Sequence, residues 1–226
     1  MFFNLAGFLT RVKYYTAWKM SEGACCLTGI DYLGTDKQEK KGDTSPKKHK
    51  WGRVANISIL NVELPENPRM MMGEWNINTQ RWLKNHVYLR FIREDGRNSG
   101  QVTMLTYLTS AFWHGFHPGF YLSFGFAALE TMTGRWARRY LRPIFLQDAP
   151  LQKYKRVYDI LGTFCSWTMT NFLMAPFVLL TVKTSLASWS SMFYYQHFAM
   201  IAIIWGFKYL GINRRLEKLG APKKLE

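Results

Sequence analysis

The sequence predicts an all-α protein, a polytopic helical membrane protein, and three observations support this fold class. Hydrophobic residues make up 48% of the 226-residue chain and aromatic residues 16%. Long uncharged blocks alternate with short basic segments, so the charge is separated from the apolar residues. The net charge of +15 therefore fits basic cytoplasmic loops beside a lipid bilayer. Because the uncharged blocks leave no module that reads a nucleic-acid groove, no nucleic-acid partner is expected.

The N-terminal part predicts one helix and two less regular segments. Residues 5–20 carry apolar side chains at helical spacing with basic residues between them, which is typical of a helix at a membrane surface and equally of a core-facing helix. Residues 35–53 are rich in Lys and polar residues and predict a mobile loop. Residues 54–68 contain two prolines and predict a surface segment. The glycosylation sequon that begins at Asn56 lies in this segment, which we place in the cytosol.

The remaining chain contains one mixed segment and three apolar blocks. Residues 75–93 combine aromatic and basic residues and predict a helix that lies along the membrane or enters it obliquely. The apolar blocks cover residues 102–130, 157–182 and 190–210, and basic segments follow the first and the third. Because positive residues mark the cytoplasmic side, the second block leads to the lumen, the third returns, and the basic tail 211–226 is cytosolic.

The first apolar block does not fit a simple crossing, since basic residues flank it on both sides. Its 29 residues are too few for two full spans of about 20 residues each. Gly115, Pro118 and Gly119 lie near its middle. A bent or re-entrant segment explains both facts, and irregular backbone at membrane depth requires cover from protein or a water-filled cavity. We therefore expect the block to bend beside a cavity.

His114 is the candidate functional residue of that block. An ionisable side chain at membrane depth is costly, which makes it a functional hypothesis by default. A hydrogen bond between helices is the simpler alternative. His117 completes an HxxH pattern, but no Cys, Asp or Glu lies nearby to complete a metal site, so no metal is predicted.

Two ordered motifs connect the chain to a known family. Trp75-Asn76-Ile77-Asn78-Thr79 with Trp82-Leu83 precedes Ser110-Ala111-Phe112-Trp113-His114-Gly115. This combination resembles the membrane-bound O-acyltransferase family. Residues 13–24, 74–93 and 109–122 further resemble its fungal lysophospholipid acyltransferase branch. The resemblance covers nearly the whole chain, 1–226, and implies the C-terminal catalytic half of such an enzyme with a partial fold of that family.

The resemblance implies that Asn76 and His114, 38 positions apart, are the catalytic pair. It implies acyl transfer from acyl-CoA to a lysophospholipid hydroxyl, with acyl-CoA as co-substrate and no other cofactor. Imidazole suits a general base because its ordinary pKa lies near 6.5 and burial lowers it. Asn76 would orient a partner or hold the developing oxyanion. Asn78 competes for this role, but the Trp-Asn context favours Asn76.

Residues around the pair are the candidates for substrate contact, namely Trp113, Trp82 and Thr79. Arg81 and Arg90 are candidates for the phosphates of CoA, although anchoring at the cytoplasmic surface explains them equally well. No serine or cysteine nucleophile with a matching base is apparent, which favours direct transfer over an acyl-enzyme.

The location and the completeness of the protein give two further expectations. Lys223 and Lys224 resemble the dilysine retrieval signal of the endoplasmic reticulum, which requires the cytosolic C-terminus that the charge pattern predicts. Family members are usually longer. The alternatives are therefore a non-catalytic truncated membrane protein or subunit, or a family member that acts on another lipid acceptor.

Overall fold

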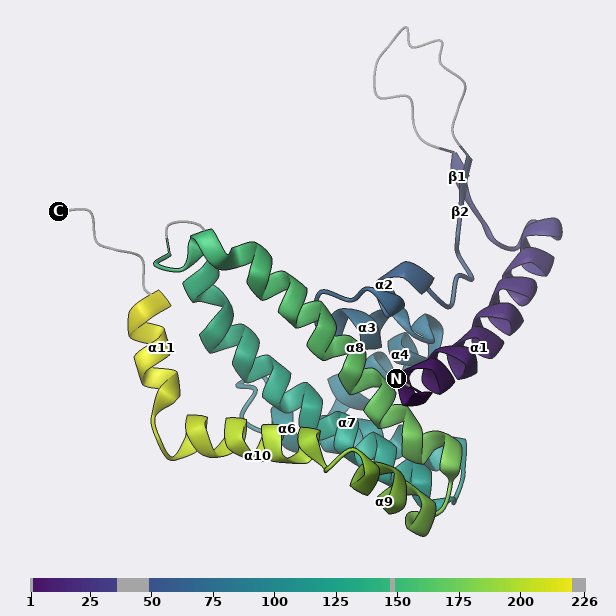
Figure 1. Cartoon of the computed structure of the whole chain (residues 1–226). Helices are drawn as coiled ribbons and strands as arrows, with labels where there is room; N and C mark the ends of the chain where they lie inside the picture. Colours follow the sequence, from purple (N-terminus) through teal and green to yellow (C-terminus); the bar gives the residue numbers. More distant parts are fainter. Residues whose placement is uncertain (1, 36–48, 147–148, 221–226) are drawn as a thin grey trace, which may run out of the picture.

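A computed structural model describes residues 2–35, 49–146 and 149–220, without the side chains of residues 2, 3 and 220, and is almost wholly helical (Figure 1). The first helix, α1 (Phe2–Leu27), leads into a two-stranded antiparallel sheet of β1 (Tyr32–Thr35) and β2 (His49–Trp51). The all-α prediction is confirmed apart from this small sheet, whose strands flank residues 36–48 of the predicted loop 35–53. Residues 36–48 of that loop lie outside the described residues.

The predicted helix 75–93 is confirmed over residues 77–91, where α4 (Ile77–Leu83), the π-helix η1 (Lys84–Tyr88) and α5 (Leu89–Phe91) follow one another without a gap. Two short helices, α2 (Ile59–Glu63) and α3 (Pro68–Glu74), precede it. Trp75 is extended and pairs with Ile57 in an isolated β-bridge, and Asn76 adopts the left-handed conformation (φ 50°, ψ 53°). These two residues separate α3 from α4 and turn the chain sharply.

The predicted bend in the first apolar block is confirmed. The block forms a hairpin of two helices, α6 (Ser99–His114) and α7 (Pro118–Trp136). Gly115 has φ 128°, a conformation that favours glycine, and Pro118 begins the second helix. Gly119 packs directly on another helix end, since a Cβ there would lie 2.2 Å from the carbonyl oxygen of Pro176. The bend is thus encoded locally and is fixed by contact with residues 176–180.

The C-terminal part matches the second predicted block, 157–182, and departs from the third. It consists of η2 (Ala137–Leu141), η3 (Arg142–Phe145), η4 (Gln152–Tyr154), α8 (Lys155–Leu179), α9 (Val182–Ser191), α10 (Tyr195–Lys208) and α11 (Ile212–Gly220). The predicted third block, 190–210, is broken between α9 and α10, where Phe193 and Tyr194 have positive φ. The tail 211–226 is helical up to residue 220. Its last six residues, with Lys223 and Lys224, lie outside the described residues.

Two hydrophobic clusters organise the helices. The first joins α7, α8, α9 and α10 through Phe126, Ala127, Phe172, Leu173, Trp189 and Met200. The second joins α1, α2, α3 and the bridge segment through Tyr15, Ile57, Val62 and Met71. In Figure 1, α1 lies at one side of the molecule and α11 at the other. Among the helices of residues 2–35, 49–146 and 149–220, none combines the length and the apolar character needed to cross a bilayer.

Candidate active site

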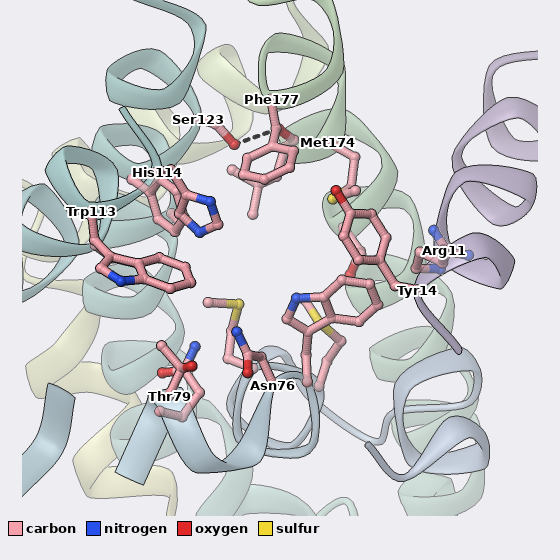
Figure 2. A pocket seen from close by; sticks show the side chains of 18 of the residues that line it. Arg11, Tyr14, Asn76, Thr79, Trp113, His114, Ser123, Met174 and Phe177 are labelled. Carbon is pink, nitrogen blue, oxygen red and sulfur yellow. Dashed lines mark hydrogen bonds between the residues drawn. The ribbon is translucent and has the colours of Figure 1, made fainter. Parts of the chain in front are cut away.

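A cavity of about 320 Å³ lies between the two hydrophobic clusters. Its wall includes Met71 of the second cluster and Ala127 and Leu173 of the first. Helices α1, α3, α4, α6, α7 and α8 all contribute side chains to it (Figure 2). Both predicted catalytic residues, Asn76 and His114, line this cavity, together with the predicted contact residues Thr79 and Trp113.

His114 is held by aromatic rings from three helices. Its imidazole stacks on Phe124 of α7 with ring centroids 5.1 Å apart and planes 25° apart. The Phe177 ring of α8 lies nearly perpendicular to the imidazole, with ring centroids 5.0 Å apart. The ring of the adjacent Trp113 is also nearly perpendicular to it, at 4.7 Å. Apolar packing therefore fixes the plane of the ring.

The nitrogens of the His114 ring are available to a substrate. Figure 2 shows the ring directed into the cavity. Within the described residues no hydrogen bond reaches either ring nitrogen. An imidazole held by its faces and edges, with its nitrogens open to the cavity, can accept a proton from a bound hydroxyl.

Asn76 lies on the opposite wall, at the N-terminus of α4. An Asn at this position ordinarily caps the helix by accepting a hydrogen bond from a backbone N–H of the first turn. The Asn76 side chain makes no such bond. Its carboxamide instead stands at the cavity wall, where Figure 2 shows it across from His114. A group that has been released from capping can serve a ligand.

A second cavity of about 380 Å³ adjoins the first. Thr79, Ser110 and Trp113 line both cavities, and Trp82 lines the second. Substrate contact by Thr79, Trp113 and Trp82 stays a prediction. Ser110 lies one turn before His114 and is only 5% exposed. The threonine hydroxyls of α6 bond back to the carbonyl four residues earlier, as Thr106 does to Val102 at 2.7 Å. In the described chain the Ser110 hydroxyl makes no such bond, so it faces the junction between the cavities unpaired.

An ion pair attaches α1 to the cavity wall. Arg11, only 1% exposed, donates from Nε and Nη2 to the Glu63 carboxylate at 2.8 and 2.7 Å, and from Nη1 to Asn171 Oδ1 at 2.6 Å. Burial alone would raise the pKa of Glu63, but hydrogen bonds from Arg11 and Tyr15 outweigh it and the pKa is lowered. The carboxylate is thus held charged. This clamp presents Tyr14 and Trp18 of α1 to the cavity.

The two arginines predicted to contact the phosphates of CoA lie outside both cavities. Arg81 and Arg90 are exposed and line neither of these cavities, and Arg81 donates to Asn78 at 3.4 Å. Their contact with CoA stays a prediction. Asn78, the alternative to Asn76, lines only the second cavity and bonds to the backbone of residues 54 and 55. His117 is exposed and, unlike His114, does not line the first cavity.

Comparison with known proteins places the chain in a family. The family model described as "MBOAT, membrane-bound O-acyltransferase family" matches residues 1–174. This range contains every residue that lines the first cavity except Phe177. The chain belongs to the membrane-bound O-acyltransferase family. The motifs that carry the resemblance in the sequence thus lie inside the matched region.

Named relatives lie in the lipid branch of this family. The chain is 42% identical to the lysophospholipid acyltransferase of Saccharomyces cerevisiae over 85% of its own length and 30% of the relative's. It is 36% identical to the lysophospholipid acyltransferase of Schizosaccharomyces pombe over 88% of its length and 38% of the relative's. The human membrane-bound glycerophospholipid O-acyltransferase 2 is 30% identical over 86% and 34%. The chain therefore spans about a third of the length of these family members.

Several residues at the site escaped the sequence interpretation. Tyr14 and Trp18 come from α1, which the sequence assigned to a membrane surface or a generic core. In the sequence Asn56 belongs only to a glycosylation sequon, yet its side chain donates to Asn76 Oδ1 at 3.0 Å. Ser110 belongs to the motif 110–115, and its place in that motif is the sequence signal that could have marked it as a site residue. Asn56 offered no signal, because its bond to Asn76 arises from the bridge between residues 57 and 75.

Proposed function

We propose that this chain is the catalytic part of an acyl-CoA-dependent lysophospholipid O-acyltransferase. The observation that carries the proposal is that Asn76 and His114 line one cavity from opposite walls although they lie far apart in the sequence. Membership of the family and the names of the relatives supply the class of reaction. The proposal needs acyl-CoA as co-substrate and no metal or prosthetic group.

In this proposal His114 is the general base. It takes the proton from the acceptor hydroxyl while the hydroxyl oxygen attacks the thioester carbonyl. The carbon–sulfur bond then breaks, and the CoA thiolate recovers the proton from His114. Asn76, at the cavity wall, donates a hydrogen bond to the carbonyl oxygen as that oxygen becomes negatively charged. Such a bond is stronger in the transition state than in the ground state.

The lining of the cavity suits acyl chains. Met71, Met72 and Met174 adapt to chains of different shape, because the thioether side chain is flexible and apolar. Most of the lining is apolar, and polar side chains such as Asn76 and Ser110 stand among the apolar ones. A lysophospholipid and an acyl-CoA can meet there without exposing either chain to water, which would cost about 0.8 kcal/mol for each exposed CH₂.

The same proposal places the protein in a bilayer. We propose that the apolar helices lie in the membrane of the endoplasmic reticulum, that the α6–α7 hairpin enters it as a re-entrant segment, and that the C-terminus is cytosolic. The exposed apolar side chains of α8 and α10, such as Phe164 (60% exposed) and Phe198 (65%), support a lipid environment. A protease-protection assay with an epitope after residue 226 tests the orientation.

The function is tested in microsomes from cells that lack their own lysophospholipid acyltransferase activity. The chain is supplied with labelled acyl-CoA and, separately, with lysophosphatidylcholine, lysophosphatidylethanolamine, diacylglycerol or a sterol. We expect incorporation into the lysophospholipids. Incorporation only into another acceptor would contradict the substrate class, and no incorporation despite normal expression would assign the chain to the non-catalytic alternative.

A further inference from the structure

Asn56 performs the capping function that Asn76 does not. Its Oδ1 accepts a hydrogen bond from the backbone N–H of Asn78, in the first turn of α4, at 3.0 Å. Its backbone carbonyl accepts from the N–H of Ile77 at 2.9 Å. Two of the free N–H groups at the start of α4 are therefore satisfied by a residue from another segment. The side chain of Asn76 is released as a consequence.

The same contacts decide which end of the Asn76 carboxamide faces the cavity. A backbone N–H can only donate, so the group of Asn56 that meets Asn78 must be its oxygen. The other group of Asn56 is then its NH₂, and this donates to Asn76 at 3.0 Å. The group of Asn76 that accepts must be Oδ1. Its Nδ2 is the end that remains, and Figure 2 shows that nitrogen on the cavity side.

We propose that Asn56 is a positioning residue which makes Asn76 a hydrogen-bond donor to the substrate carbonyl. This inference rests on the proposed function and goes beyond it in one respect. The sequence left open whether Asn76 donates or accepts, and whether it orients substrate or His114. A fixed NH₂ directed into the cavity selects stabilisation of the oxyanion, because an oxyanion only accepts hydrogen bonds.

Two substitutions of Asn56 separate positioning from simple structural support. Asn56→Asp keeps the bond to the Asn78 N–H but presents an oxygen to Asn76, so the Asn76 carboxamide must turn over and direct its own oxygen at the substrate. Asn56→Ala removes both bonds and leaves Asn76 free to adopt either orientation. We therefore expect kcat to fall about 100-fold in Asn56→Asp, the loss typical of one oxyanion donor, and less in Asn56→Ala. KM should change by less than about threefold, since the interaction forms in the transition state.

Thermal stability should follow the opposite order. Asn56→Ala should lower Tm more than Asn56→Asp, because only the alanine variant loses the cap on α4. If the alanine variant were the worse of the two in both kcat and Tm, Asn56 would be a structural residue and the proposal would be overturned. A kcat near the wild-type value in Asn56→Asp would overturn it equally.

Asn98→Asp is the matched control. Asn98 bonds in the same way, accepting from the N–H of Arg93 at 3.0 Å and donating to the carbonyl of Phe91 at 2.8 Å, but it lines neither cavity. We expect its kcat to stay within about twofold of wild type. The charge introduced at residue 56 is controlled by salt, which screens electrostatic effects over about 10 Å at 0.1 M. Recovery of Asn56→Asp in high salt would assign the loss to charge and would contradict the orientation.

A binding measurement keeps this test independent of turnover. The probes are a non-hydrolysable ketone analogue of acyl-CoA and the matching S-alkyl-CoA, which has no carbonyl oxygen. Wild type should bind the ketone about twofold to threefold more tightly, and Asn56→Asp should lose this preference while Asn98→Asp keeps it. Absence of any preference in wild type would overturn the donor assignment. An inactive wild type that nevertheless shows the preference would contradict only the proposed function.

Discussion

The two walls of the cavity hold their functional groups by different means. The His114 wall is apolar, and the imidazole is packed against Phe124 and Phe177. The Asn76 wall is polar, and its carboxamide is oriented by Asn56, which reaches it across the bridge between residues 57 and 75. Ring packing restricts the plane of a side chain but leaves its nitrogens open. A hydrogen bond selects one of two ends, so the polar wall can determine which atom faces the substrate.

The largest effect should come from the His114 wall. His114→Ala should lower kcat by a factor of about 10² to 10⁴, because the base is lost. His117→Ala is the matched control, since this exposed histidine lies three residues further on and outside the cavity lining. Acyl transfer in microsomes measures both variants. Activity of His114→Ala equal to that of the control would remove the base from this wall.

The Asn76 wall should respond almost as strongly. Asn76→Ala should lower kcat by a factor of about 10² to 10³, the usual loss when one oxyanion donor is removed. Asn85→Ala, at an exposed position on η1, should retain wild-type activity. Steady-state kinetics with lysophospholipid in excess distinguishes this loss from weaker binding. A rise in KM alone would mean that Asn76 binds substrate and does not act on the transition state.

The clamp on α1 should affect the Asn76 wall more than the His114 wall. Glu63→Gln should lower the free energy of unfolding by about 3 kcal/mol, because it leaves the buried Arg11 charge uncompensated. The lower end of the range applies since Glu63 is 15% exposed. The α1 side chains Tyr14 and Trp18 pack on Trp75 at 5.6 and 5.0 Å, so their support beside Asn76 should loosen.

Thermal unfolding in detergent, followed by tryptophan fluorescence, measures this loss. Glu66→Gln is the control, because Glu66 is exposed and takes no part in the Arg11 contacts. Equal stability of the two variants would show that the ion pair does not hold α1 in place.

The smallest effect should come from the junction of the two cavities. Ser110→Ala should lower kcat about tenfold, the equivalent of one ordinary hydrogen bond to a substrate oxygen. Thr109→Ala, whose hydroxyl bonds to the carbonyl of Leu105, should have little effect. The ratio of the two kcat values is the measurement. A ratio near one would place Ser110 in the lining of the passage only.

Part of this site was predictable from the sequence. His114, Asn76, Thr79, Trp113 and Trp82 were identified by their motifs, and all five line the two cavities. The bend after His114 was predicted from Gly115, Pro118 and the charged flanks, and a local cause of this kind is readable because it involves neighbouring residues. The break of the third block at residues 192–194 and the small sheet were not predicted.

What the sequence determined by itself is the candidate pair, Asn76 and His114, and the turn that follows His114, because residue type, spacing and glycine or proline conformation act over short distances. What only the tertiary structure decided is how those groups are oriented. The approach of α1 through Arg11 and Glu63, and the capping of α4 by Asn56 in place of Asn76, join segments that lie 52 and 22 residues apart. Such hydrogen bonds form only after the chain has packed, and no local pattern records them.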